Sequence, residues 1–354
     1  MLNAGTLIHG GIMVNYQCSA ACRHCLYSCS PTRGSGYTVE AEQPPNNPSS
    51  RARPEGAYVD EASAENICRY LSKGDCRSVH IGGGEPFLDV DGLVMVIRKL
   101  RQTGIKLEYI ETNAYWAFDA SAKKTAKENL ERLLAEGAST LCISVDPFHA
   151  EYVPYGAPLA LAELCDKTGM EYFLWKREFL PTLSRLDSRK THTRAEMEKA
   201  LSRDYIHKTA RLYGIGYGGR AINIEREYGV LYPAEHFVAG KTSGEASSCH
   251  NLLSTGHFHV DMHAYFIPPR CTGIRIPLSE AVEGIPAGKY PVFEALYSGG
   301  VGALMRLAQE HGFSPGGADY PSKCSLCFRI RHFHADKNFA ELDKDHYEES
   351  LKYY

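Results

Sequence analysis

The stretch RSVHIGGGEPFLDVDGLVMVIRKLRQTG (77–104) contains one complete structural unit. We expect a buried strand at its first five residues, RSVHI (77–81). Asp89 is placed to cap the helix that follows, and Gly104 is placed to end it. The loop between strand and helix is GGGEP (82–86). A strand, a loop and a helix in this order indicate one βα unit of a parallel sheet.

The same unit recurs between about residues 60 and 175. Further strands are expected at GGIMVNY (10–16), IKLEYIET (105–112), STLCISV (139–145) and EYFLW (171–175), with a weaker sixth near 211–217. Alternating strands and helices of this kind form right-handed crossovers and a parallel sheet. About six strands suit an open barrel better than a closed one with eight. We therefore predict the α/β class, as a partial (β/α)6 TIM-like barrel with a smaller C-terminal α+β domain.

The domain boundaries follow from changes in composition. We expect the barrel over 1–230, the smaller domain over 245–335 and a C-terminal tail over 336–354, with RHFHAD (331–336) solvated. Residues 30–57 are rich in Pro, Ser, Asn and Gly, which is typical of a mobile loop.

The composition is that of an ordinary globular protein, with 44% hydrophobic and 23% charged residues in a chain of 354. A net charge of −3 without a basic stripe gives no reason to expect a nucleic-acid partner. The first thirty residues have neither the pattern of a signal peptide nor that of a membrane span. We therefore expect a cytoplasmic protein, in which clustered cysteines are metal ligands rather than disulfides.

Unusual loops follow four successive strands. They are CSAACRHC (18–25), GGGEP (82–86), TNA (112–114) and SVDPFH (144–149). In a parallel barrel the loops after the strands open on one face, where active sites assemble. The four loops are therefore expected to meet at one site.

The cysteine loop is the strongest of these signals. Three thiolates, Cys18, Cys22 and Cys25, can hold three irons of a cubic four-iron cluster and leave the fourth iron open. A zinc ion would want a fourth ligand, for which Cys29 is available. Cys29 is otherwise a hydrogen-atom donor or an ordinary buried thiol.

The other loops offer groups for a polar ligand. GGGEP supplies unobstructed backbone N–H groups and the carboxylate of Glu85, which can pair with an ammonium group. Asn113, Ser144 and Asp146 supply short polar side chains for hydroxyls or a carboxylate. Asp146 and His149 either exchange a proton with the substrate or serve as a structural cap.

In CSAACRHC (18–25), GGGEP (82–86) and ISVD (143–146), taken in this order, the sequence resembles the radical S-adenosylmethionine (radical SAM) enzymes over roughly residues 8–220. The resemblance implies a four-iron four-sulfur cluster on the three cysteines, whose open iron binds the methionyl group of S-adenosylmethionine. It implies that the remaining contacts with that cofactor come from His24 near the adenine, Gly83, Gly84 and Glu85 at the amino group, and Ser144 at the carboxylate or ribose. IGYGGR (215–220) is expected to form a turn near the cofactor.

A second set of cysteines lies in the smaller domain. Cys249, Cys271, Cys324 and Cys327 could hold zinc or a fully ligated iron–sulfur cluster. The stretch from Cys249 to Cys271 resembles the hairpin of the twitch and SPASM extensions of radical SAM enzymes, although Ala264 stands where glycine is common. That resemblance implies one auxiliary four-iron cluster that relays electrons, with zinc as the alternative.

The segment HFHVDMH (257–263) places four polar side chains on one face of a strand. His257, His259, Asp261 and His263 form either a metal site or a polar wall beside the substrate. The four cysteines outside both sets are expected in the core: Cys68, Cys76, Cys142 and Cys165.

The expected function follows from the resemblance. A reductant such as flavodoxin or ferredoxin supplies one electron, the sulfonium cofactor splits, and a 5′-deoxyadenosyl radical removes hydrogen from a peptide or a peptide-derived small molecule. Oxidation or bond formation then completes the reaction of this oxidoreductase. The alternatives are dehydrogenation of a small polar metabolite, a zinc-structured binding module and a pure electron carrier.

Overall fold

The βα unit over 77–104 forms as predicted. Strand β2 (Ser78–Gly82) is buried along its whole length. Helix α2 (Val90–Thr103) begins after Asp89, whose carboxylate accepts a hydrogen bond from the backbone N–H of Gly92 at 2.8 Å. This cap satisfies one of the N–H groups that the first turn leaves without a partner.

The computed structural model describes residues 2–33, 56–118, 122–216, 218–238, 248–317 and 319–352. Residues 34–55 of the predicted mobile loop lie outside the described residues. Among the described helices, none combines the length and the apolar composition that crossing a bilayer requires.

The core of the molecule is one sheet of eight strands, in the order β5-β4-β3-β2-β1-β7-β8-β9. Its first five strands are parallel and coincide with the predicted ones. Besides β2 they are β1 (His9–Met13), β3 (Lys106–Thr112), β4 (Thr140–Ser144) and β5 (Glu171–Trp175). The α/β class and the open parallel sheet are therefore confirmed.

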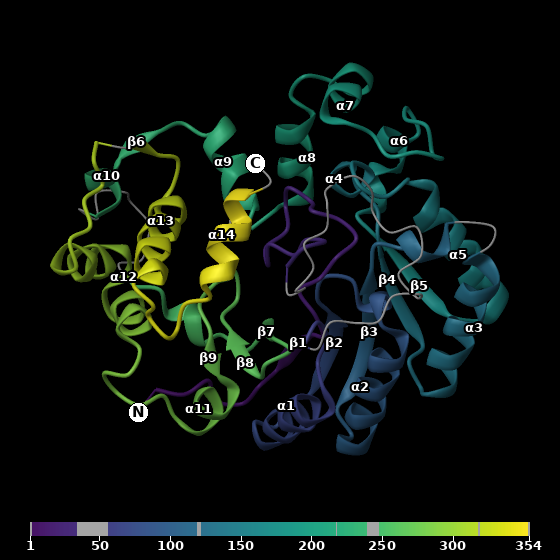
Figure 1. Ribbon diagram of the computed structural model, residues 1–354, viewed down its shortest axis with the longest axis horizontal. Coiled ribbons are helices and arrows are strands. Elements are labelled where there is room, and N and C mark those ends of the chain that lie inside the picture. The colour runs from purple at the N-terminus through teal and green to yellow at the C-terminus, as the bar shows by residue number, and fades with distance from the viewer. Residues whose placement is uncertain are drawn as a thin grey trace.

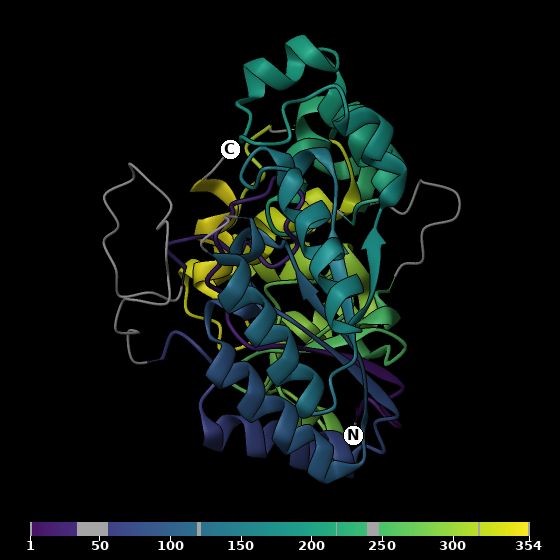
Figure 2. The same ribbon diagram turned by 90° about the vertical axis from the view of Figure 1, so that its right-hand side faces the viewer.

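Helices cover the outer face of these strands (Figures 1 and 2). Each turns an apolar side toward the sheet, as Leu93, Val94 and Ile97 of α2 do. The covering helices besides α2 are α1 (Glu61–Lys73), α3 (Ala122–Ala135) and α5 (Gly156–Thr168). The inner face of the sheet is left for the site.

The sixth parallel strand is not the one predicted near 211–217. Residues 211–213 belong to helix α8 (Tyr205–Tyr213), which buries Tyr205, Ile206, Thr209 and Ala210 at helical spacing. The sixth position is taken by β7 (Phe258–Val260), which pairs in parallel with β1. The sheet then continues through the antiparallel strands β8 (Tyr265–Ile267) and β9 (Ile276–Pro277).

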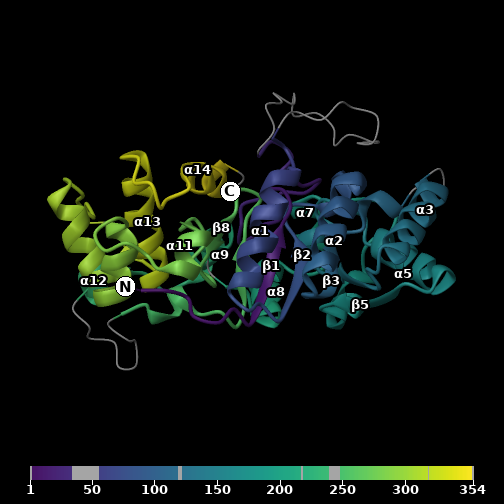
Figure 3. The ribbon, with the colours of Figure 1, turned by 90° about the horizontal axis from the view of Figure 1, so that it is seen from below.

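The remaining elements surround the site and build the C-terminal part, which lies beside the barrel (Figure 3). Between β4 and β7 they are α4 (Pro147–Ala150), α6 (Leu180–Leu183), α7 (Arg194–Ala200), α9 (Ala221–Tyr228), β6 (Tyr232–Pro233) and α10 (Ala234–Val238). After β9 they are α11 (Leu278–Glu283), α12 (Pro291–Glu310), β10 (Asp319–Tyr320), α13 (Lys323–Asp336) and α14 (Lys344–Lys352).

The prediction that RHFHAD (331–336) is solvated is wrong. These residues end helix α13, and Arg331 and His334 are buried. The charged residues of this segment suggested exposure to solvent. Arg331 is instead buried because it has a partner inside the protein, the carbonyl oxygen of Thr272, to which it donates a hydrogen bond at 2.7 Å. Within the predicted C-terminal tail, α14 also folds back and buries Tyr347 and Ser350.

Candidate functional site

The cysteine loop follows β1 and enters a cavity of about 590 Å³ on the inner face of the sheet. The cavity brings together most of the predicted site residues: Cys18, Cys22, His24, Cys25, Cys29, Gly83, Gly84, Asn113, Ser144 and His149. These residues come from the loops after four different strands, as the barrel rule required.

Hydrogen bonds hold the cysteine loop in shape. Arg220, which is buried, donates from Nε to the carbonyl oxygen of Cys22 at 3.0 Å and from its terminal nitrogen to that of Cys29. The backbone N–H of Arg220 donates to the carbonyl oxygen of Cys25 at 3.1 Å. The predicted turn at 215–220 therefore lies against the cysteine loop, although it follows helix α8 rather than a strand.

Cys29, which follows the cysteine loop, lies beside Cys25. The backbone N–H of Cys29 points at Cys25 Sγ, 3.3 Å away. A hydrogen bond from the Cys29 thiol lowers the pKa of Cys25 well below its ordinary value. Burial acts in the opposite direction, and the charge of Arg220 lowers the pKa further. The thiolate is the form that binds metal, so this environment favours Cys25 as a ligand.

The strip of glycines after β2 faces the same loop. Gly83 adopts a φ of +144°, which favours glycine, and a Cβ at Gly84 would overlap the carbonyl oxygen of Gln17. The backbone N–H of Gly84 donates to Asn15. Two glycines are therefore required for this strand end to lie against the segment that carries the cysteines.

Glu85 is oriented differently from the expectation. Gly83, Gly84 and Pro86 line the cavity, whereas the Glu85 carboxylate accepts hydrogen bonds from Phe87 N (3.2 Å), Thr112 Oγ1 (2.9 Å) and Asn113 N (2.8 Å). Burial raises the pKa of Glu85 to about 7. These contacts join the loop after β2 to the end of β3, and any cofactor amine would compete with them.

Asn113 is held by this arrangement directly beside the cysteines. Its side-chain nitrogen donates to Ser19 Oγ at 3.1 Å and approaches Cys18 Sγ at 3.6 Å. The side-chain oxygen accepts a hydrogen bond from Tyr115 N at 3.1 Å. The amide is therefore fixed in orientation at the wall of the cavity.

Asp146 is a helix cap as well as a partner of His149. Its carboxylate accepts from Phe148 N and His149 N at the start of α4, and lies 2.6 Å from His149 Nδ1. Burial acts to raise the pKa of Asp146, but His149 outweighs it and lowers the pKa to about 2. His149 is the member of the pair that lines the cavity.

His24 occupies an aromatic pocket. The centroid of its ring lies 4.9 Å from the ring centroid of Phe148, 5.0 Å from that of His149 and 4.8 Å from that of Tyr213. Burial lowers the pKa of His24 to about 4, so the ring is a neutral aromatic surface at physiological pH. A flat nucleobase is the kind of group such a pocket accepts.

The second cysteine set also comes together in the fold. Burial, together with Cys327, Cys324 and Cys249, raises the pKa of Cys271 to about 12, with Arg331 acting in the opposite direction. Cys324 and Cys327 lie in the first two turns of α13, and the predicted hairpin forms from β7 and β8. Ala264 turns this hairpin at a φ of +60°, which explains why glycine would suit the position.

The predicted polar face of HFHVDMH (257–263) divides in two. His257 and His259 line the cavity. Asp261 instead fixes the hairpin turn, where it accepts from His263 N (3.0 Å) and Tyr265 N (2.9 Å), and His263 is exposed. The division has a physical cause, because the strand ends at Val260 and the alternation of side chains ends with it.

Some residues of the site escaped sequence reasoning. Trp175 ends β5 and lines the cavity, so the rule that placed the other loops also applies to it. Arg220 ends the predicted turn IGYGGR (215–220), but no spacing pattern indicates that its side chain binds the cysteine loop. The four cysteines expected in the core, Cys68, Cys76, Cys142 and Cys165, are buried as predicted.

The thiols and the glycine strip fit the groups that the resemblance implies. Three cysteine sulfurs line a cavity that also has room for a nucleoside-sized molecule beside His24. The four-thiol set of the C-terminal part is a complete donor set for a metal centre.

Solved structures were compared with the chain as a whole. Streptococcus suis SuiB bound to S-adenosylmethionine is 13% identical with a TM-score of 0.38, over 75% of this chain and 60% of that one. Native anSMEcpe with bound AdoMet is 12% identical with a TM-score of 0.41, over 98% and 96%. The chain thus spans 60% of the length of SuiB.

One family model matches part of the sequence. No curated protein matches the chain with significance. Residues 12–168 match the family model of the Radical SAM superfamily, and this range contains the end of β1, the cysteine loop, the glycine strip and strands β2, β3 and β4. Residues 12–168 therefore carry a radical SAM domain, which uses a four-iron four-sulfur cluster and S-adenosylmethionine as its cofactors.

Proposed function

We propose that the chain is a radical SAM oxidoreductase that acts on a peptide or a peptide-derived small molecule. When bound, the cluster and S-adenosylmethionine supply a 5′-deoxyadenosyl radical that removes a hydrogen atom from the substrate. The observation that carries the proposal is the meeting of the CxxxCxxC loop with the Gly83–Gly84 strip at one cavity of about 590 Å³.

In this proposal the chain holds the first cluster through Cys18, Cys22 and Cys25. Arg220 supports the assignment because it binds the carbonyl oxygens of the loop and fixes the directions of the thiols. Cys29 lies beside Cys25 and hydrogen-bonds to its sulfur, and we assign it a supporting role rather than that of a ligand.

The proposed contacts with S-adenosylmethionine follow from the geometry of the wall. The backbone at Gly83 and Gly84 would contact the methionyl amine. Asn113 and Ser144 would contact the polar groups of the cofactor, and the ring of His24 would pack against the adenine. Glu85 acts by positioning this wall, since its carboxylate is already held by three protein N–H and O–H groups. His149 is the proposed site of proton exchange with the substrate.

The second thiol set is proposed to hold an auxiliary four-iron cluster in the domain over 245–335. With all four ligands supplied by the protein, this cluster would accept or pass an electron rather than bind substrate. Its α13 helix places Cys324 and Cys327 at a helix N-terminus, which stabilises negative charge. Flavodoxin or ferredoxin is the proposed reductant.

A peptide is favoured over a small metabolite by the openness of the cavity. Trp175 lines the cavity and is still 43% exposed, so the site is continuous with the surface at β5, which is an edge of the described sheet. Peptides commonly bind along exposed strand edges next to aromatic side chains. Dehydrogenation of a small polar metabolite is the alternative.

The test is anaerobic reconstitution with iron and sulfide, followed by incubation with dithionite and S-adenosylmethionine. The proposal predicts a brown protein that releases 5′-deoxyadenosine. A zinc-structured module would be colourless, and an electron carrier would be brown without releasing the nucleoside. Peptides encoded beside the gene, deuterated at candidate carbons, should transfer deuterium to the nucleoside. Transfer from a small metabolite instead would overturn the peptide assignment.

A further inference from the structure

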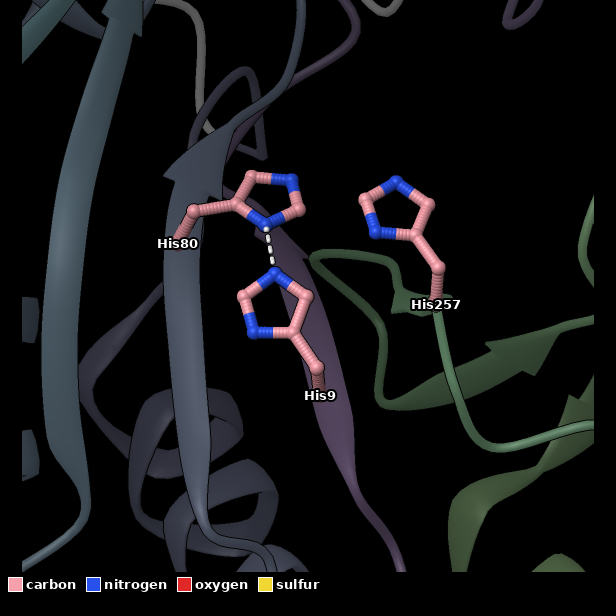
Figure 4. A group of neighbouring side chains, drawn as sticks. All are labelled: His9, His80 and His257. Atoms are coloured by element: carbon pink, nitrogen blue, oxygen red, sulfur yellow. Dashed lines mark hydrogen bonds between the residues drawn. The ribbon is translucent and has the colours of Figure 1, made fainter.

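A cluster of histidines lies on the inner face of the sheet, between the starts of β1 and β7 and the middle of β2. His9 begins β1, His80 lies within β2, and His257 directly precedes β7, so the three come from neighbouring strands. Figure 4 shows their imidazole rings turned toward one another. The cysteine assignments above do not use these residues.

The backbone makes room for this cluster at Gly11. Gly11 pairs with both His80 and His259 in the sheet register, and a Cβ at Gly11 would overlap both imidazoles. Any side chain at this position would therefore displace the rings. The close approach depends on one glycine in the central strand.

The distances among the rings suit a shared ion. One ring nitrogen from each of His9, His80 and His257 lies within 4.8 Å of the other two. His9 Nε2 and His80 Nδ1 are 3.1 Å apart, and the ring centroids are 5.2–5.5 Å apart. Metal–nitrogen bonds of about 2.0–2.1 Å place two ligand nitrogens roughly 3.4 Å apart, so shifts of about 1 Å or less would complete the site.

The outward nitrogens of two rings already have partners. His9 Nδ1 lies 2.9 Å from Ser78 Oγ and 3.7 Å from Glu108 Oε2. The other nitrogen of His80, Nε2, lies 3.2 Å from His259 Nε2 and 3.9 Å from Glu111 Oε1. Such outer contacts orient the rings of metal-binding histidines and fix which nitrogen faces the ion.

Charge and chemistry favour a cation over an anion at this cluster. Binding an anion would require protonated imidazoles, which the burial of His80 and the crowding of the rings oppose. Neutral imidazole is a ligand for zinc, iron, nickel and copper. Three ligands leave a coordination position open, and His257 and His259 line the cavity that the cysteine loop enters.

We propose that His9, His80 and His257 bind one divalent transition-metal ion, of which zinc is the expected species, with an open position facing the substrate cavity. His259 supports the site from beside His80, and Tyr27 of the cysteine loop lies 5.0 Å from the His259 ring. The open position would accept an oxygen or nitrogen atom of the substrate, which orients the substrate toward the cysteine loop.

The experiment is a titration of the reconstituted protein with Co²⁺, a coloured substitute for zinc. Wild type should bind one equivalent with visible d–d bands and without thiolate-to-metal charge transfer, which separates this site from both cysteine sets. His257→Ala is the test variant because His257 is exposed and its loss spares the core. The matched control is His263→Ala, which removes an exposed histidine of the same segment.

The expected loss of Co²⁺ affinity in His257→Ala exceeds the roughly 10–100-fold loss expected for Ser78→Ala, which removes only an outer contact. His263→Ala should bind as wild type does. Equal amounts of bound Co²⁺ in wild type and His257→Ala, counted by metal analysis, would overturn the proposal, whether or not charge-transfer bands show further cobalt on the cysteine sets. The titration requires no cleavage of S-adenosylmethionine, so its outcome is independent of the proposed function.

Discussion

At the scale of single residues, Glu85 shows how a motif residue can act through its neighbours. Its carboxylate accepts three hydrogen bonds from the protein and so fixes Thr112 and Asn113 at the wall of the cavity. Sequence reasoning assigned the carboxylate to the cofactor amine. It could not foresee the competing donors, because they come from another strand.

Glu85→Gln should therefore lower both the stability of the protein and its affinity for S-adenosylmethionine. The new NH₂ group faces N–H or O–H donors, so at least one buried donor loses its acceptor, at a cost of about 1–3 kcal/mol in the free energy of unfolding. Affinity for S-adenosylmethionine should fall as Asn113 moves. Thermal unfolding and equilibrium binding measure the two effects, with exposed Glu163→Gln as the control. Reduced binding with unchanged stability would instead indicate a direct contact.

Arg220 is the residue that most directly fixes the cysteine loop. Hydrogen bonds from a charged group contribute about 1.5–3 kcal/mol each, and its side chain makes two to loop carbonyl oxygens. Arg220→Met should lower the iron content of the reconstituted protein, measured by iron and sulfide analysis. Exposed Arg226→Met on the same helix should retain the iron. Full iron in both variants would show that the loop holds its shape without Arg220.

At the scale of elements, α14 and the segment before it fasten the cysteine loop from outside. Ser28 Oγ lies 2.6 Å from Ser350 Oγ, and buried Arg33 forms an ion pair with Asp343 at 2.5 Å. Figure 1 shows α14 beside α9, whose Asn223 donates to the carbonyl oxygen of Ser350 at 2.8 Å. A segment predicted to be a tail is thus part of the support of the site.

Asp343→Ala should destabilise this support strongly. Removing one partner leaves the Arg33 guanidinium buried without its carboxylate, which costs about 3–5 kcal/mol in the free energy of unfolding. Denaturant unfolding measures the loss, and Asp345→Ala, an exposed neighbour, is the control. A difference below about 1 kcal/mol would indicate that the pair behaves as a surface ion pair.

Elements whose signals are local could be predicted, and those set by distant contacts could not. The strands and helices between 60 and 175 carry their own caps, apolar periodicity and glycine stops, such as Asp60 and Gly169 of α1 and α5. The position of the sixth parallel strand was predicted wrongly because β7 pairs with β1 across more than two hundred residues of sequence. The cysteine and glycine motifs revealed the site, whereas the positions of Arg220, His9 and His80 depend on the assembled sheet.

At the scale of the whole molecule, one sheet links the two thiol sets. β1 leads into the cysteine loop and pairs with β7, the first strand of the hairpin between Cys249 and Cys271. The barrel and the C-terminal part therefore share a backbone frame. Such a frame keeps the two thiol sets at a constant separation.

Removing one ligand of the second cysteine set should distinguish the iron bound there from the iron bound by the cysteine loop. Wild type should contain about eight irons and Cys327→Ala about four, if each set holds a four-iron cluster. The variant should still release 5′-deoxyadenosine but lose the oxidised product. Core variant Cys165→Ala should match wild type in iron. About four irons in wild type, unchanged in Cys327→Ala, would contradict the auxiliary cluster.

The most direct test of the account replaces one sulfur of the loop that enters the cavity. Anaerobic, reconstituted wild type, Cys22→Ala and the core variant Cys68→Ala are incubated with dithionite and S-adenosylmethionine, and 5′-deoxyadenosine is quantified by chromatography. We predict release of the nucleoside by wild type and Cys68→Ala, and none above background by Cys22→Ala. Equal release by Cys22→Ala would contradict the assignment of this loop.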